Sequence, residues 1–456
     1  MHVLPLLFFV LKGLGFLKGS VFMPQNYNDK GLNMKAVLVA LQMRGMTAEE
    51  VEKSLDELER LLDTAGGEVF AKVVQVKDTP DIRTVVGSGK VTEIGEFCRA
   101  NDIELIIFDC ELSPSQIRNL EEGTDVRVID RSMLILDIFA LHAVTGEGKL
   151  QVELAQLKYT APRLIGKGLE MSRLGGGIGT RGPGESKLES DRRHMKRRIV
   201  ALEAELEELD KNRSTMRAAR DRSGIAKVAI VGYTNAGKST LLNRLTDAGI
   251  LAEDKLFATL DPTTRKFELP CGESVLLTDT VGFIRKLPHH LVKAFKSTLD
   301  EAVYADILLI LIDASDEECE SELAVTDKLL TELGASGKPT LYVFNKCDKA
   351  SELPTLADGE RENIFYISAK TGEGVDAMIS RLEEIVQSGK KRLVFTIPNA
   401  EQGALNILYK NASVEDVEYG AESVKVTATV DAKVRGMLGK YLPEGDRIKK
   451  ESEADW

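Results

Sequence analysis

A glycine-rich segment from Gly232 to Ser239 has the residue types and spacing needed to hold phosphate groups. It reads Gly-Tyr-Thr-Asn-Ala-Gly-Lys-Ser and lies between an apolar run and a run that favours a helix. The glycines allow backbone N–H groups to turn inward around phosphate oxygens, and the following helix directs its positive end at them. In such a loop the lysine reaches the β- and γ-phosphates, and the serine hydroxyl ligates Mg²⁺. The candidate phosphate-binding residues are Gly232, Tyr233, Thr234, Asn235, Ala236, Gly237, Lys238 (also catalytic) and Ser239 (also a metal ligand).

A second candidate motif follows the apolar run that ends at Asp279. A carboxylate at the end of a strand can hold Mg²⁺ through water, and a glycine N–H just beyond it can contact the γ-phosphate. Three further apolar runs, 307–313, 340–344 and 363–368, predict buried strands with polar residues at their ends. A glycine-rich turn alone could bind nothing, but this ordered set predicts a nucleoside triphosphate site. Its second group of candidates is Asp279, Thr280, Val281 and Gly282.

The base is selected by the tetrapeptide Asn345-Lys346-Cys347-Asp348. Guanine presents N1–H and its 2-amino group as adjacent donors, and a carboxylate at Asp348 can accept from both. Adenine has no such pair, so it would leave the carboxylate buried and unpaired. We expect Asn345 and the stem of Lys346 to tie the loop and cover the ring. Backbone N–H groups are expected to close the other side of the base, from Ser368, Ala369 and Lys370. The predicted substrate is therefore GTP, with Mg²⁺ as cofactor.

These motifs together resemble the translation-factor class of P-loop GTPases, and in detail the HflX family of its Obg–HflX branch. The segment 257–265 is similar to the first switch of that family, 279–284 to its second switch, and 173–184 to a glycine-rich segment ahead of its GTPase domain. The resemblance covers about Lys35 to the C-terminus. It implies a GTP-hydrolysing switch that associates with the ribosome, mainly with the large (50S) subunit and its RNA, possible roles being ribosome splitting, recycling or rescue under stress.

The resemblance also implies roles for the first switch. It makes Thr259 the switch threonine that ligates Mg²⁺ and a catalytic residue together with Lys238 and Gly282. The residues alone leave Thr263 and Thr264 as alternatives, because they lie in the same loop. The nucleotide-binding candidates of this segment are Phe257, Ala258, Thr259, Leu260 and Asp261.

Phe283 stands where Ras-type proteins place a glutamine that orients the attacking water. Phenylalanine can neither donate nor accept that hydrogen bond. No arginine finger is evident in the sequence. We therefore expect slow intrinsic hydrolysis and stimulation by a partner.

Composition and charge narrow the class of protein. The chain has 456 residues, of which 43% are hydrophobic and 29% charged, which is ordinary for globular domains and predicts two to four of them. The five cysteines show no CxxC spacing, so we expect neither a zinc site nor a disulfide framework, and a cytoplasmic location. The net charge of −12 argues against extensive coating by nucleic acid. We predict a monomer without DNA as partner and without stable membrane insertion.

A local basic patch nevertheless precedes the phosphate-binding loop. Its glycine-rich part, 174–184, contains no GK[ST] and is interpreted as a flexible connector whose N–H groups and arginines could hold RNA phosphates. The helix predicted from 186 to 220 could simply pack on the N-terminal domain, or could in addition present a basic face. The basic residues are Arg163, Lys167, Arg173, Arg181, Lys187, Arg192, Arg193, Lys196, Arg197 and Arg198.

The predicted fold class is α/β. A P-loop GTPase domain with a Ras-like, mostly parallel sheet (224–390) follows a smaller N-terminal α/β domain (34–160) and a glycine-rich basic loop with a long helical arm (161–223). A small α+β domain (391–456) ends the chain. Residues 1–33 are interpreted as a non-native or disordered extension, with translation starting at Met34 or Met23.

Within the N-terminal domain, alternating strands and helices predict a parallel sheet. Strands are expected at 35–41, 71–76, 105–108 and 125–130. A helix is expected from Thr47, whose spacing to Glu50 is that of a capping box. Gly87-Ser88-Gly89-Lys90 lacks the preceding glycine and the following Ser or Thr of a phosphate loop, so we interpret it as a turn that opens a helix. The resemblance implies ATP binding at the N-terminal domain in some members of the family, so ATP binding here is kept as a minor alternative.

The function of the whole chain also has an alternative. It is a nucleotide-gated RNA-binding or scaffold module that does not act on ribosomes.

Overall fold

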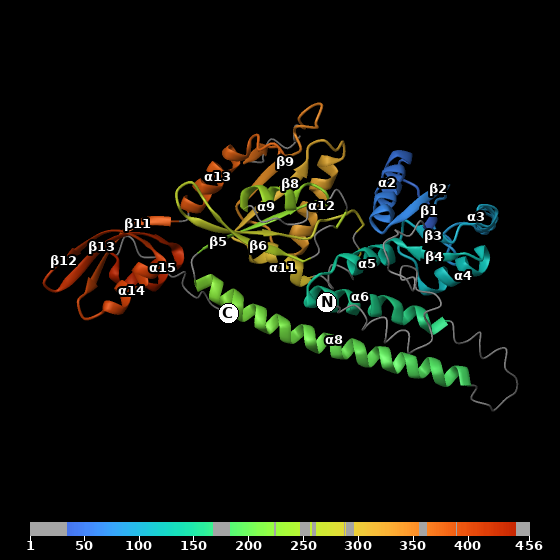
Figure 1. Ribbon diagram of the computed structural model, residues 1–456, viewed down its shortest axis with the longest axis horizontal. Helices are drawn as coiled ribbons and strands as arrows, with labels where there is room; N and C mark the ends of the chain where they lie inside the picture. Colours follow the sequence, from blue (N-terminus) through green and yellow to red (C-terminus); the bar gives the residue numbers. More distant parts are fainter. Residues whose placement is uncertain are drawn as a thin grey trace, which may run out of the picture.

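The computed structural model describes residues 34–166, 183–222, 225–246, 256–257, 261–286, 288, 296–354, 363–388 and 390–443. The predicted N-terminal extension and most of the glycine-rich segment lie outside these residues. The described elements form three sheets, which Figure 1 shows in a row along the molecule.

The N-terminal sheet has four parallel strands in the order β2-β1-β3-β4. The capping box predicted at Thr47 and Glu50 is confirmed, and Ser113 and Gln116 form a second one. The strand expected from Asp125 begins two residues later, because Asp125 adopts a left-handed conformation as the C-cap of the preceding helix. The elements are β1 (Met34–Gln42), α2 (Ala48–Thr64), β2 (Gly67–Val76), α3 (Ser88–Ala100), β3 (Leu105–Phe108), α4 (Pro114–Thr124) and β4 (Arg127–Asp130).

A helical hairpin connects this sheet to the next. After α5 (Arg131–His142) come α6 (Gly146–Thr160), the short 3-10 helix η1 (Ala161–Gly166) and the 40-residue α8 (Pro183–Arg222), which runs back along α6 (Figure 1). Ion pairs Glu147–Arg213 and Glu153–Arg198 join the two helices. Met195 and Leu202 of α8 are buried, so the predicted packing of this arm is confirmed. The first half of the hairpin, α6, was not predicted.

The central sheet has the order β10-β9-β8-β5-β7-β6, in which only β6 is antiparallel to its neighbour. This confirms the predicted P-loop GTPase fold. The apolar runs of the sequence form its central strands because residues there are buried on both faces. The strands are β5 (Ala226–Gly232), β6 (Thr263–Glu268), β7 (Ser274–Asp279), β8 (Ile307–Asp313), β9 (Thr340–Asn345) and β10 (Ile364–Tyr366); the helices are α9 (Lys238–Thr246), α11 (Lys296–Tyr304), α12 (Cys319–Glu332) and α13 (Val375–Ser388).

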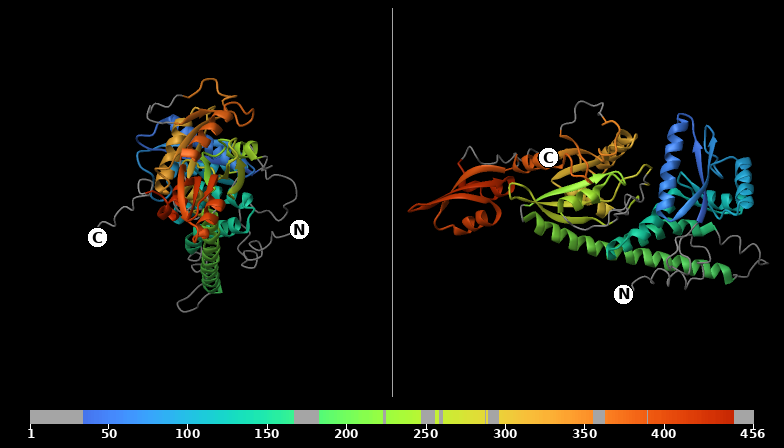
Figure 2. Two further views of the ribbon diagram at one scale, coloured as in Figure 1. Left: turned by 90° about the vertical axis from the view of Figure 1, so that its left-hand side faces the viewer. Right: turned by 45° about the horizontal axis from the view of Figure 1, so that its top comes forward.

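The third sheet is antiparallel, in the order β11-β13-β12, and has its own buried cluster. It lies at the end of the molecule remote from the N-terminal sheet in both Figure 1 and Figure 2. The apolar runs at 394–398 and 423–430 predict the strands β11 and β13 of this small α+β domain, whereas β12 was not predicted. Its elements are β11 (Lys390–Pro398), α14 (Gln402–Asn411), β12 (Ser413–Tyr419), β13 (Ser423–Asp431), α15 (Ala432–Met437) and η2 (Gly439–Tyr441).

The N-terminal and central sheets share one buried hydrophobic cluster. It includes Leu58, Leu61 and Phe139 from the N-terminal part and Phe283 and Ile284 from the central part. Figure 2 shows α8 running along both parts. This shared cluster places the N-terminal domain against the loops that carry the predicted nucleotide site.

Candidate functional site

The phosphate-binding loop connects the end of β5 to the start of α9. Gly232 and Gly237 have φ values of +148° and +94°. A Cβ at Gly232 would lie 2.1 Å from the carbonyl oxygen of Leu311, and one at Gly237 would lie 2.3 Å from Nδ2 of Asn345. Both positions therefore require glycine for the backbone path and for the close approach of the neighbouring strands.

Lys238 is the first residue of α9, and it is 6% exposed. Its ammonium donates to the carbonyl oxygens of Tyr233 at 2.7 Å and Gly232 at 3.3 Å. Burial lowers the pKa of Lys238 to about 8, although the carboxylate of Asp279 opposes this effect. A phosphate group would stabilise the charged form, so the site favours an anion next to this ammonium.

A pair of hard oxygen donors faces the loop from β7. The Ser239 hydroxyl donates to Oδ2 of Asp279 at 2.6 Å, and Asp279 is fully buried. The hydroxyl of Thr280 is engaged elsewhere, because it donates to the carbonyl of Ile230 at 2.8 Å. Hydroxyl and carboxylate oxygens are the ligands that Mg²⁺ prefers. The residues present thus fit the predicted Mg²⁺, while Ala258, Thr259 and Leu260 lie outside the described residues.

Gly282 and Phe283 pack directly on the phosphate-binding loop. A Cβ at Gly282 would lie 2.7 Å from Cα of Thr234 and 3.0 Å from Nζ of Lys238. The backbone of Phe283 donates to Gly232 O at 3.1 Å and accepts from Thr234 N–H at 2.8 Å. Its ring is 1% exposed and belongs to the shared hydrophobic cluster, as the neighbouring Val281 also does. Position 283 thus offers the nucleotide no polar side chain.

The base-specificity motif and the loop after β10 meet through Asn345, which is 2% exposed. Its Nδ2 donates to the carbonyl of Ala236, and its Oδ1 accepts the N–H of Ala369, both at 2.8 Å. Asp348 is exposed, and a hydrogen bond from the Ser368 side chain holds its pKa below the usual range. The sequence candidates Lys346, Cys347 and Lys370 lie beside them. Lys346 pairs with Asp313 at 2.6 Å, and burial raises the pKa of the Cys347 thiol.

The described ends of the first switch contact the N-terminal domain. The ring of Phe257 lies edge-on to Phe139 of α5, with centroids 4.7 Å apart. The carboxylate of Asp261 accepts the N–H groups of Val144 at 3.0 Å and Thr145 at 2.8 Å, where α6 begins. The structure therefore places these two candidates against the N-terminal domain, and their contact with the nucleotide stays a prediction.

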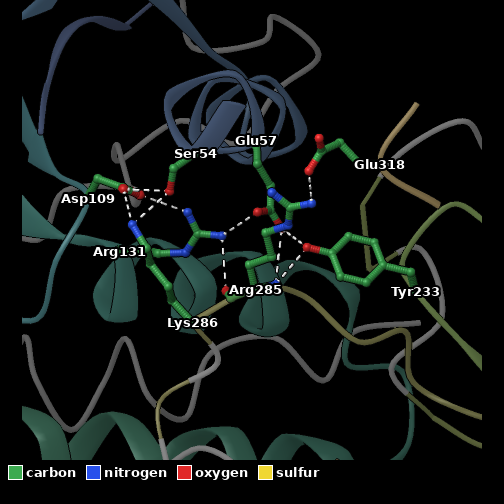
Figure 3. Close-up of polar contacts among 8 residues, drawn as sticks. All are labelled: Ser54, Glu57, Asp109, Arg131, Tyr233, Arg285, Lys286 and Glu318. Carbon is green, nitrogen blue, oxygen red and sulfur yellow. Dashed lines mark hydrogen bonds and ion pairs between the residues drawn. The ribbon is translucent and has the colours of Figure 1, made fainter. Parts of the chain in front are cut away.

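A buried polar network between the two domains was not predicted (Figure 3). Arg131, at the start of α5, is 2% exposed and pairs with Asp109 at 2.8 Å and Glu57 at 3.0 Å. It also donates to the backbone carbonyl of Arg285, just beyond the second switch, at 3.1 Å. Lys286 reaches the same Asp109 from the GTPase side at 2.5 Å. The network thus fixes the backbone after the second switch.

Tyr233 extends this network into the phosphate-binding loop. Its hydroxyl donates to Glu57 at 2.5 Å and accepts the N–H of Arg285 at 2.6 Å. Burial, with the Glu57 carboxylate nearby, raises the pKa of Tyr233, so the hydroxyl remains a donor. Figure 3 shows this side chain directed toward the N-terminal domain. The only sequence signal was that Asp109 and Arg131 each follow directly the end of a buried strand.

Two residues of the predicted basic patch are engaged in contacts within the protein. Arg198 pairs with Glu153 at 2.6 Å, and Arg163 donates to the carbonyls of Tyr159 and Leu112. These two arginines therefore stabilise the arm rather than form an open basic face. Lys167, Arg173 and Arg181 lie outside the described residues, as does the side chain of Lys187. In the described part of α8 between residues 192 and 198, the exposed lysine and arginine side chains are Arg192, Arg193, Lys196 and Arg197.

The segment at Gly87 is the turn that begins α3, as expected. In the described part of the chain, no helix is both long and apolar enough to span a bilayer. Within the same residues, no three His, Cys, Asp or Glu side chains are grouped as metal ligands.

Comparison with known proteins agrees with this geometry. Family models match residues 52–140 (GTP-binding GTPase N-terminal), 142–220 (GTP-binding GTPase Middle Region) and 227–346 (50S ribosome-binding GTPase). The protein GTPase HflX of Lacrimispora saccharolytica is 50% identical over 409 residues, 90% of this chain and 96% of the relative. GTPase HflX of Escherichia coli K12 is 42% identical over 384 residues, 84% and 89% of the two chains.

A solved structure is also similar. It is a GTP-binding protein from the hyperthermophilic archaeon Sulfolobus solfataricus in complex with GDP, with 27% identity, a TM-score of 0.41 and coverage of 78% of this chain and 99% of that one. The extent of identity to the curated relatives decides the assignment. The chain therefore belongs to the HflX family of GTPases and is a GTP-hydrolysing enzyme.

Proposed function

We propose that this GTPase is a nucleotide-dependent switch that associates with the ribosome, mainly with the large (50S) subunit and its RNA, and takes part in splitting, recycling or rescue under stress. The exposed basic face of α8, formed by Arg192, Arg193, Lys196 and Arg197, carries this proposal. Basic side chains on an exposed helix bind RNA phosphates and release counterions. The family model matched by the GTPase domain, described as a 50S ribosome-binding GTPase, supports the same partner.

The nucleotide roles proposed for the site follow its geometry. The Lys238 ammonium contacts the β- and γ-phosphates, and the N–H of Gly282, next to that ammonium, contacts the γ-phosphate. Mg²⁺ would be held by the hydroxyls of Ser239 and Thr259, and by Asp279 through water; the role of Thr259 rests on the family resemblance, because this residue lies outside the described part of the chain. Mg²⁺, when bound, neutralises charge on the phosphates.

At the other end of the nucleotide, Asp348 accepts from the guanine base and Asn345 fixes the two loops around it. The protein is proposed to act as a cytoplasmic monomer that does not bind DNA. Its intrinsic hydrolysis is proposed to be slow, because the buried ring of Phe283 cannot orient water. The ribosome then stimulates the reaction by ordering the two switches.

Sedimentation tests the partner. Purified protein is centrifuged with 50S or 70S particles in the presence of a non-hydrolysable GTP analogue or of GDP. We expect pelleting with 50S particles, and more with the analogue than with GDP. Absence of ribosome pelleting with either nucleotide would refute the proposal, and retained binding to free RNA would then favour the alternative of an RNA-binding module.

The basic face is tested with a matched pair of variants. Replacing Arg192, Arg193, Lys196 and Arg197 with alanine should weaken 50S binding and flatten its dependence on salt concentration. The control removes four exposed basic residues elsewhere: Arg44, Arg99, Lys328 and Lys391. GTP affinity should be unchanged in both. Equal weakening in the two variants would mean that net charge, not this face, determines binding.

A further inference from the structure

Arg244 links the helix that carries the phosphate-binding loop to the loop that closes the base site. It lies in the last turn of α9 and its side chain is exposed. The guanidinium donates to the carbonyl oxygens of Lys370 at 3.2 Å and Thr371 at 2.7 Å. Two parallel donors on a rigid plane suit two neighbouring carbonyls, which a lysine ammonium cannot match with one fixed geometry.

The backbone of this loop is shaped to receive the guanidinium. Gly372 has a φ of +97°, and a Cβ at this position would lie 2.0 Å from Nη2 of Arg244. Any side chain at 372 would therefore displace Arg244. The guanidinium of Arg244 can thus approach the loop backbone only because residue 372 is glycine.

The two carbonyls that Arg244 holds belong to peptide units whose N–H groups hold Ser368. In a trans peptide the C=O and the N–H point in opposite directions. The N–H of Thr371 donates to Oγ of Ser368 at 3.1 Å, and the N–H of Gly372 donates to its carbonyl oxygen at 2.7 Å. Fixing the outer face of these peptides thus fixes Ser368 on the inner face.

Ser368 in turn contacts the residue that reads the base. It is fully buried, and its side chain hydrogen-bonds the exposed carboxylate of Asp348. Asn345 fastens the same loop from the inside, at Ala369. In the described part of the chain, this loop is therefore hydrogen-bonded by Arg244 at its carbonyl oxygens and by Asn345 at the N–H of Ala369.

We propose that Arg244 is a positioning residue for guanine recognition, which acts through the peptide units after Lys370 and through Ser368 on the Asp348 carboxylate. This inference rests on the proposed role of Asp348 at the base. The guanidinium of Arg244 donates to backbone carbonyls of the loop, so its effect is on the accuracy with which the loop presents Asp348.

The test measures affinities of the full chain for GDP, for a non-hydrolysable GTP analogue and for inosine diphosphate, which lacks the 2-amino group. Arg244→Ala should raise the Kd for both guanine nucleotides by the same factor, roughly three- to ten-fold, because solvent-exposed hydrogen bonds contribute only modestly. The preference for GDP over inosine diphosphate should narrow. The hydrolysis rate at saturating GTP should be unchanged.

Three further variants separate the possible causes. Arg244→Lys should recover only part of the affinity, because it restores charge but not the two-carbonyl geometry. Ser368→Ala should lower the same preference for GDP over inosine diphosphate. Because the two residues act through one chain of contacts, the double variant with Arg244→Ala should lose less than the sum of the two single losses, and the difference measures their coupling. Lys328→Ala, a charge-matched exposed change on α12, should leave all values unchanged.

Several results would overturn the inference. These are a Kd changed less than two-fold in Arg244→Ala, an effect on the GTP analogue but not on GDP, full recovery by Arg244→Lys, or strict additivity with Ser368→Ala. Asp348→Asn separates a failure of the base-site assignment from a failure of the role of Arg244. If Asp348→Asn keeps the preference for GDP over inosine diphosphate, the base-site assignment itself fails. If Asp348→Asn loses this preference while Arg244→Ala changes no affinity, only the role of Arg244 fails.

Discussion

Replacing Phe283 with glutamine should not create a water-positioning residue, although it restores the residue type that Ras-type proteins carry there. The N–H and the carbonyl of Phe283 are both hydrogen-bonded to the phosphate-binding loop. Its ring lies in the hydrophobic cluster shared with the N-terminal domain. A glutamine on this backbone would follow the ring into that cluster. Catalysis by such a group requires it to be preorganised toward the attacking water.

The cost of this change can be derived from burial. Deleting a buried phenylalanine to alanine costs about 3–5 kcal/mol. Glutamine keeps part of the volume but buries an amide, which costs about 1–3 kcal/mol when it lacks partners. We therefore expect Phe283→Gln to lower the free energy of unfolding by about 3–5 kcal/mol, a large fraction of the roughly 5–15 kcal/mol typical of a domain. Phe283→Leu, which stays apolar, should cost only about 1.5 kcal/mol.

Urea unfolding and single-turnover GTP hydrolysis measure the two consequences. The glutamine variant should be clearly less stable, and both variants should hydrolyse GTP no faster than the natural protein. A glutamine variant of unchanged stability with hydrolysis accelerated about ten-fold or more would refute this reasoning. It would place the side chain at 283 beside the γ-phosphate rather than in the cluster.

Further predictions concern binding, pH and rate. Lys238→Ala should lose useful GTP binding, because the phosphates lose the buried ammonium; near-normal affinity by titration calorimetry would contradict the site. Asp348→Asn should shift the preference from guanine toward xanthine nucleotides, whose added carbonyl suits an amide donor; competition binding measures this. Burial raises the pKa of Asp137 to about 7, so the folded protein holds a proton there that the unfolded chain releases near pH 4. Its contribution to stability is therefore present at low pH and lost as pH rises from about 4 to 7, and Asp137→Asn should remove that slope and be the more stable form at pH 8 in denaturation curves. The isolated protein should hydrolyse GTP on the order of 10⁻⁴ to 10⁻² per second, and 50S particles should accelerate it; a fast rate indifferent to ribosomes would indicate an autonomous enzyme.

Features set by residues close in sequence were predictable. The capping box of Thr47 and Glu50 involves partners within one helical turn. The run Ile307–Asp313 forms β8 because a strand covered on both faces must be apolar throughout. The phosphate-binding loop is likewise a local motif, since its glycines and Lys238 serve one short turn.

Features set by distant residues were not predictable. The hydrogen bond from Tyr233 to Glu57 joins residues 176 positions apart, and nothing in the local pattern of either indicates the other. The same holds for Asp261, whose carboxylate accepts the N–H of Thr145, 116 positions away, at the start of α6. Strand β12 was missed for another reason. It is an edge strand rich in exposed acidic residues, so it lacks the apolar alternation that marks a buried strand.

The length of α8 has a mechanical consequence. Its 40 residues span about 60 Å at 1.5 Å per residue. Only a few residues separate its C-terminal end from β5, the strand that enters the phosphate-binding loop. A tilt of about 5° at that end would carry the opposite end through about 5 Å over this length. A small change of angle where α8 leads into β5 would therefore become a displacement of several ångströms where the arm turns back, although the strand itself lies between the helix end and the phosphate-binding loop.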